Sequence, residues 1–121
     1  MSRFLATRLA IAGVLLALGA GALAAENTVR PEVGKPLKAA EALLKAGKGH
    51  EALAKVSEAD AVANKTPYES LLIEQMRGSA AHAAGDYPAA IKAFQSVISS
   101  GKLGARESLA MMEAIAVDYY K

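Results

Sequence analysis

The sequence has no cysteine and no tryptophan, and its aromatic residues are limited to four tyrosines and two phenylalanines. Without cysteine the fold can contain no disulfide, so packing alone must hold it together. Only two histidines are present, and neither has further ligands at a metal-binding spacing, so we expect no metal site. The serines lack a nucleophile elbow, and no glycine-rich loop for a phosphate or a dinucleotide is found. These absences predict a protein that has no cofactor and is not an enzyme.

The first 24 residues have the three-part layout of a secretory signal peptide. Arg3 and Arg8 supply the positive start, an apolar run covers residues 9–23, and small residues surround Ala24. We expect cleavage after Ala24 and a bacterial protein that is periplasmic or secreted. No cysteine follows the apolar run, so lipid attachment is not expected. The run is close to the shortest length for a spanning helix, so a retained membrane anchor remains the alternative.

Removal of this leader changes the charge of the chain. The sequence has fourteen basic residues, and loss of Arg3 and Arg8 leaves twelve, against twelve acidic residues. A protein that binds nucleic acid or an anionic membrane surface usually presents an excess of basic residues. The mature chain is formally neutral, so we expect neither nucleic acid nor membrane among its partners.

Apolar residues recur at helical spacing through most of the remaining chain. Residues 25–35 contain Pro31 and Gly34 without such spacing, so they are expected to form an extended lead-in. Residues 36–121 then form one helical domain, in which apolar stripes at 37–44, 52–63, 72–83, 87–98 and 109–119 predict helices. The third has a capping box at its start, with Thr66 and Glu69. The sequence thus predicts an all-α fold of about five helices after a signal peptide, with the last helix reaching Lys121.

Two stretches of the helical domain repeat each other at a separation of 38 residues. Residues 46–53 read AGKGHEAL, and residues 84–91 read AGDYPAAI. In this pattern the chain resembles the tetratricopeptide repeat family, whose helix pairs combine small residues, a turn with glycine and an aromatic residue. The family's period is about 34 residues, and Arg77 stands where the family has a leucine. The positions that carry the resemblance are Ala40, Gly47 and Ala52 in one copy, and Gly78, Gly85, Tyr87, Ala90 and Phe94 in the other.

The resemblance implies an array of antiparallel helix hairpins, an α-solenoid with two helix pairs and one further helix. It also implies a concave face, lined by the first helix of each pair, that binds a peptide or helix of another protein. Transferred position by position, this face comprises Glu41, Lys45, Gln75, Ser79, His82, Glu113 and Tyr120. Ordinary solvent-facing residues of helices would give the same set.

The expected function is therefore that of an exported scaffold or adaptor that binds a partner segment in the bacterial cell envelope. The alternative is an accessory or regulatory docking subunit of a cell-envelope enzyme complex. The last helix has apolar residues that no later helix covers, among them Met112, Ile115, Tyr119 and Tyr120. Self-association through this helix is a further possibility, because repeat units bury their apolar faces on neighbours.

Overall fold

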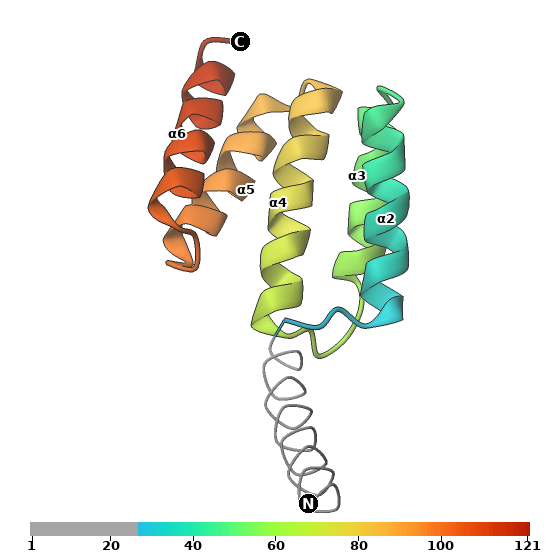
Figure 1. Cartoon of the computed structure of the whole chain (residues 1–121). Coiled ribbons are helices and arrows are strands. Elements are labelled where there is room, and N and C mark those ends of the chain that lie inside the picture. The colour runs from blue at the N-terminus through green and yellow to red at the C-terminus, as the bar shows by residue number, and fades with distance from the viewer. Residues whose placement is uncertain (1–26) are drawn as a thin grey trace, which may run out of the picture.

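The structure, a computed structural model, describes residues 27–121, and all regular structure within them is helical (Figure 1). The helices are α2 (Pro31–Lys45), α3 (Gly49–Asp60), α4 (Pro67–Ala84), α5 (Tyr87–Ser99) and α6 (Ala105–Tyr119). The prediction of an all-α fold with five helices is confirmed. The predicted signal peptide and its cleavage after Ala24 lie outside the described residues. Among residues 27–121, no helix has both the length and the apolar character needed to cross a membrane.

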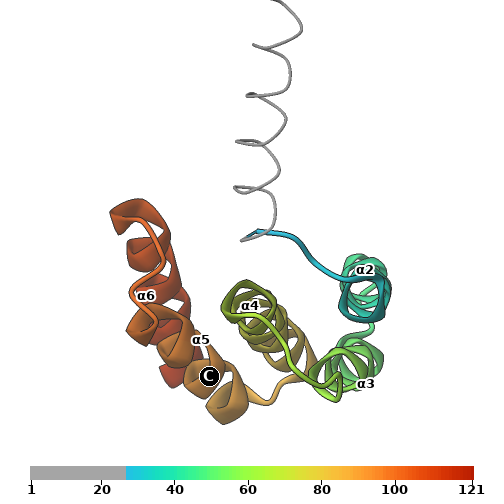
Figure 2. The ribbon, with the colours of Figure 1, turned by 90° about the horizontal axis from the view of Figure 1, so that it is seen from below.

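The helices form a row in which each one packs against the next along the chain, and α2 also contacts α4. Figure 1 shows that α2 and α4 begin at the same end of the molecule. In the view from below, α2 and α6 lie at the two ends of the row with α4 between them (Figure 2). This order places α2 beside α4, the first helices of the two predicted pairs.

The ends of α4 follow the predicted signals. The Thr66 hydroxyl accepts from the Glu69 amide at 3.1 Å, and the Glu69 carboxylate accepts from the Thr66 amide at 2.9 Å. This reciprocal pair is the expected capping box. At the other end Gly85 has φ +81°, a left-handed conformation that glycine adopts without steric cost. Gly47 ends α2 in the same way, with φ +75°.

The first helix begins earlier than the sequence predicts. Residues 31–35 were expected to be extended, but α2 starts at Pro31 and includes Gly34. Proline is favoured at a helix start because its missing amide would have no partner there. Val33 is fully buried and continues the helical spacing of Leu37 backwards by one turn. The expected lead-in is therefore wrong for residues 31–35, and α6 likewise ends at Tyr119 before the predicted Lys121.

The core has two parts that meet at α4. The first joins α2, α3 and α4, and it contains Val33, Leu37, Ala40, Ala52, Val56, Ala59, Ile73 and Ala80. The second comprises Ala81, Ala90 and Phe94, with Leu53, Ala89, Met111, Ala114 and Ile115 packed against them. The many alanines leave little side-chain volume between helices, so the helix axes can approach closely. Ala40, Ala52 and Ala90, three of the predicted repeat positions, are all fully buried.

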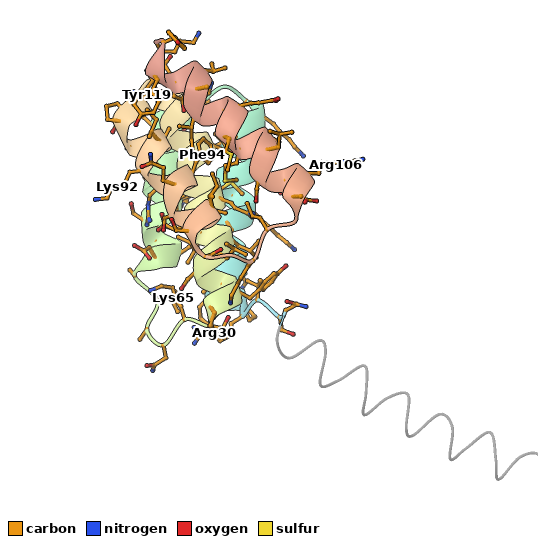
Figure 3. All side chains as sticks on the ribbon, turned by 90° about the vertical axis from the view of Figure 1, so that its left-hand side faces the viewer. Arg30, Lys65, Lys92, Phe94, Arg106 and Tyr119 are labelled. Carbon is orange, nitrogen blue, oxygen red and sulfur yellow. The ribbon has the colours of Figure 1, made fainter. Side chains whose placement is uncertain are left out.

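Two glycines mark the closest helix contacts. A Cβ atom on Gly78 would lie 2.8 Å from the Phe94 Cζ and closer still to Cδ1 and Cε1. Phe94 is 8% exposed and lies between helices in Figure 3, so its ring occupies the space that the missing side chain of Gly78 leaves. A Cβ on Gly49 would lie 2.9 Å from the Ala83 carbonyl oxygen. Gly49 is the first residue of α3 and packs against the backbone of α4.

Candidate functional site

An ion pair between the partly exposed Arg30 and the buried Glu69 joins the start of α2 to the start of α4. The Glu69 side chain is fully buried, and Arg30 reaches it with Nε at 3.1 Å and Nη2 at 3.1 Å. The Arg30 amide also donates to the same carboxylate at 3.0 Å. Arg30 Nη2 further donates to the carbonyls of Ala63 and Asn64 in the α3–α4 turn. Figure 3 shows Arg30 at this end of the molecule, together with Lys65.

The hydrogen bonds from the Arg30 side chain and the Thr66 amide lower the pKa of Glu69 to about 2, against the opposing effect of burial. The side-chain hydrogen bond between Arg30 and Glu69 also raises the pKa of Arg30. Glu69 therefore stays ionised at any ordinary pH and holds α2 and α4 in register. The sequence predicts Glu69 only as a cap and contains no signal for the role of Arg30. No local pattern connects two residues that lie 39 positions apart.

A second polar contact, made by Arg77, joins α3 to α4. Arg77 Nη2 lies 2.8 Å from the Asp60 carboxylate, and Nη1 pairs with Glu74. Asp60 is the last residue of α3, and Lys65 also lies 3.7 Å from it. Arg77 thus connects the end of α3 to the middle of α4 through charge.

Between α2 and α4 the structure contains an open groove of about 340 Å³. Its apolar floor is formed largely by the buried Leu37 and the half-buried Leu72 and Met76. The α2–α4 groove, as we call it, is lined by Val29, Gly34, Leu37, Lys38, Glu41, Leu72, Gln75, Met76 and Ser79. Lys38 and Glu41 give its α2 rim both signs of charge, and Gln75 and Ser79 add neutral polar groups from α4.

Three of the seven predicted binding residues meet in this groove, namely Glu41, Gln75 and Ser79. Lys45 lies one turn beyond Glu41 on α2 and forms an exposed ion pair with it at 3.4 Å. It does not line the groove, but its charge offsets that of Glu41. The α2–α4 groove is therefore the part of the predicted binding face that the structure brings together.

The other predicted binding residues lie elsewhere. His82 does not face the groove as a free side chain, because its Nδ1 pairs with the buried carboxylate of Asp118 on α6. Its ring also meets the ring of Tyr87 edge to face, with centroids 5.6 Å apart. Glu113 is exposed on α6, and Tyr120 is 92% exposed just after that helix. The apolar α6 residues Leu109, Met112 and Tyr119 are also exposed, at 59%, 51% and 66%.

The lining of the α2–α4 groove combines apolar and polar side chains. It offers apolar contact area and polar groups that can donate or accept hydrogen bonds, and its ionisable groups, Lys38 and Glu41, are exposed. Across residues 27–121 no group of three or more histidine, aspartate or glutamate side chains is placed to hold a metal ion. Similar hollows, of about 420 and 430 Å³, lie at the start of α4 and at the end of α6. Of these three hollows in residues 27–121, only the α2–α4 groove is bordered by two helices that carry predicted binding residues.

Comparison with known proteins gives no relative from which a role could be transferred. The chain matches no protein-family model, no curated protein and no solved structure. The residues and the geometry of the groove are accordingly the basis for its function.

Proposed function

We propose that this chain is an exported interaction scaffold or adaptor of the bacterial cell envelope, and that the α2–α4 groove holds a segment of its partner. One observation carries the proposal. The groove joins an apolar floor to polar residues from both α2 and α4, including Glu41, Gln75 and Ser79. In the tetratricopeptide repeat family, which the chain resembles, the first helix of each pair also lines the ligand-binding face. This supports the choice of the face formed by α2 and α4.

The composition of the groove favours an amphipathic segment. Its volume of about 340 Å³ falls at the lower end of the range of about 300–1,000 Å³ for ligand sites. We expect one or two apolar side chains of the partner to rest on Leu37, Leu72 and Met76. Met76 suits such a role because its thioether side chain adapts to different shapes. Lys38 and Glu41 would pair with charges of both signs at the edge of the bound segment.

The sequence at the N-terminus supports the location. Residues 1–24 combine a positive start, an apolar run and small residues before Glu26, which is the pattern of an exported protein. A protein delivered to the envelope in this way would meet its partner there. Fractionation of cells that express the chain tests the location, because an exported product is found in the periplasm or the medium with its first residue near Ala25.

The binding proposal is tested by photo-crosslinking in living cells. A photoreactive residue is placed at Glu41, which is exposed at the groove, or at Lys92, which points away from the helix row (Figure 3). We expect one captured protein from position 41 that is absent from position 92. Mass spectrometry identifies the protein and the crosslinked segment.

A groove-filling substitution makes the test specific. Ser79 is exposed, so Ser79→Trp should fold normally while its indole ring covers the apolar floor. Capture from position 41 should then fall severalfold. Lys92→Trp is the matched control, because it adds the same ring on the opposite side. Equal capture with and without Ser79→Trp would show that the partner does not use the groove.

A further inference from the structure

The exposed apolar side chains of the described chain gather on α6. Leu109, Met112 and Tyr119 are 59%, 51% and 66% exposed. Within residues 27–121, every exposed leucine, methionine, valine or tyrosine lies between positions 109 and 120. Such a concentration of apolar surface on one element marks a contact surface, since exposed apolar residues are otherwise scattered singly.

The exposed residues form a stripe along the helix. Positions 105, 109, 112, 116 and 119 alternate by four and three residues, a spacing that keeps them on one face and that is typical of paired helices. We call this the α6 stripe, and it consists of Ala105, Leu109, Met112, Ala116 and Tyr119, all exposed. Met111, Ala114 and Ile115 pack instead against the cluster that contains Phe94. The α6 stripe is therefore separate from the face that α6 uses within the chain.

Two charged residues beside the α6 stripe indicate what covers it. Arg106 and Glu113 lie on the same edge of the stripe, two turns apart, and both are exposed. Figure 3 shows Arg106 projecting outward from the start of α6. Neither side chain forms an ion pair within residues 27–121. About 10 Å of helix separates them, so they cannot pair with each other.

A second copy of α6, laid antiparallel against the first, brings these charges together. Because the direction reverses, Arg106 of each copy lies across from Glu113 of the other. The same register places Leu109 on the partner's Met112, and Ala105 on the partner's Ala116. Every contact then occurs twice about a two-fold axis. A shift of seven residues would set Glu113 against the partner's Glu113, so charge selects one register.

We propose that the α6 stripe joins two copies of this chain through an antiparallel pair of α6 helices, with Arg106 and Glu113 paired across the interface. A helix of an unrelated protein has no reason to carry the complementary charges in reversed order, whereas a second copy does so by symmetry. The α6 stripe shares no residue with the α2–α4 groove, and either proposal can fail without the other.

Sedimentation velocity of the purified protein over a range of concentrations tests the pairing. We expect a reversible change from monomer to dimer with a dissociation constant of roughly 10–100 μM, because one helix per copy makes a small and weak interface. A protein that stays monomeric well above this concentration range would overturn the proposal.

Charge exchange tests the register. Arg106→Glu places like charges at both contacts and should weaken the dimer about tenfold, and Glu113→Arg should do the same. An equal mixture of the two variants, or the double variant with both changes, pairs opposite charges again and should restore the dimer. Lys92→Glu makes the same change of charge on α5 and should have no effect. If neither the mixture nor the double variant restores the dimer, the antiparallel pairing is wrong.

A substitution within the α6 stripe distinguishes this interface from any other. Met112 is 51% exposed, and Met112→Gln keeps the length of the side chain, so the fold should remain intact, which circular dichroism verifies. The change should weaken the dimer severalfold, because the partner's Leu109 loses its apolar contact. A dimer of unchanged affinity in both Met112→Gln and Arg106→Glu would show that the copies associate elsewhere, contrary to the proposal.

Discussion

Replacement of Gly78 by alanine should destabilise the protein, although alanine is the better helix former. Gly78 lies within α4 and faces the ring of Phe94 on α5. A Cβ added to it would lie 2.8 Å from Cζ and closer still to two other ring atoms. Real Cβ atoms do not approach other atoms so closely, so either the ring or the helix must move.

The expected size follows from two opposing effects. Alanine in place of glycine within a helix stabilises by about 1 kcal/mol. Overpacking of a close contact destabilises by roughly 1–3 kcal/mol. Phe94 is 8% exposed and packed within its cluster, so the ring has little room to turn and the cost should be near the upper end. We expect a net loss of roughly 2 kcal/mol in the free energy of unfolding.

Urea unfolding followed by circular dichroism measures this loss. Gly34→Ala is the matched control, since its Cβ would meet only Val29 Cγ1 at an ordinary 3.5 Å. The control should stabilise by roughly 0.5–1 kcal/mol. Addition of Phe94→Leu to Gly78→Ala should restore part of the loss, because the smaller side chain leaves space for the new methyl group. Stabilisation by Gly78→Ala equal to that of the control would refute the assigned contact between α4 and α5.

Three other outcomes follow from the packing and the charges. Phe94→Ala should lower the free energy of unfolding by roughly 3–5 kcal/mol, and a loss below about 1 kcal/mol in urea unfolding would mean that Phe94 is not a buried wedge. Gly49→Ala should lower the melting temperature measurably, because its Cβ would press on the backbone of Ala83 and Ala84, which cannot turn aside. Because the pKa of Glu69 is lowered to about 2, its ionised carboxylate contributes fully to the free energy of unfolding above about pH 4.5. This contribution is lost as the pH falls through about 2. Melting temperatures of the wild type and Glu69→Gln should therefore converge over that window, and a constant difference down to pH 2 would contradict the ion pair between Arg30 and Glu69.

Local signals were sufficient to predict the helices. The capping box at Thr66, the left-handed glycines at 47 and 85 and the apolar spacing each act within a few residues, so the sequence shows them directly. The expected extended start is wrong for α2, because Pro31 and Gly34 lie within the helix although both residue types often interrupt helices. Proline in the first position of a helix is favourable, and the burial of Val33 decides the boundary.

Contacts between distant residues were not predictable in the same way. Arg30 with Glu69 and His82 with Asp118 join residues 39 and 36 positions apart. A single sequence contains no pattern that links such pairs. The assignment of His82 to a binding face followed from the repeat register alone, and register does not show that another helix places a carboxylate beside that residue.

The predicted binding face was divided for the same reason. The register gives the exposed side of each first helix, and for α2 and α4 these sides meet in one groove that contains Glu41, Gln75 and Ser79. The exposed side of α6 does not join this groove, so Glu113 and Tyr120 lie apart from Glu41, Gln75 and Ser79. The position of a helix relative to its neighbours depends on packing volumes, such as the contact between Gly78 and Phe94, rather than on the periodicity of its own residues.

The central claim is that the α2–α4 groove holds a partner segment. Its most direct test is a binding isotherm, in which the segment identified by crosslinking is synthesised, labelled and titrated with the purified protein. We predict that Ser79→Trp weakens this binding at least about tenfold, a change of about 1.4 kcal/mol, while Lys92→Trp leaves it unchanged. Equal affinity for the wild type and Ser79→Trp would contradict the claim.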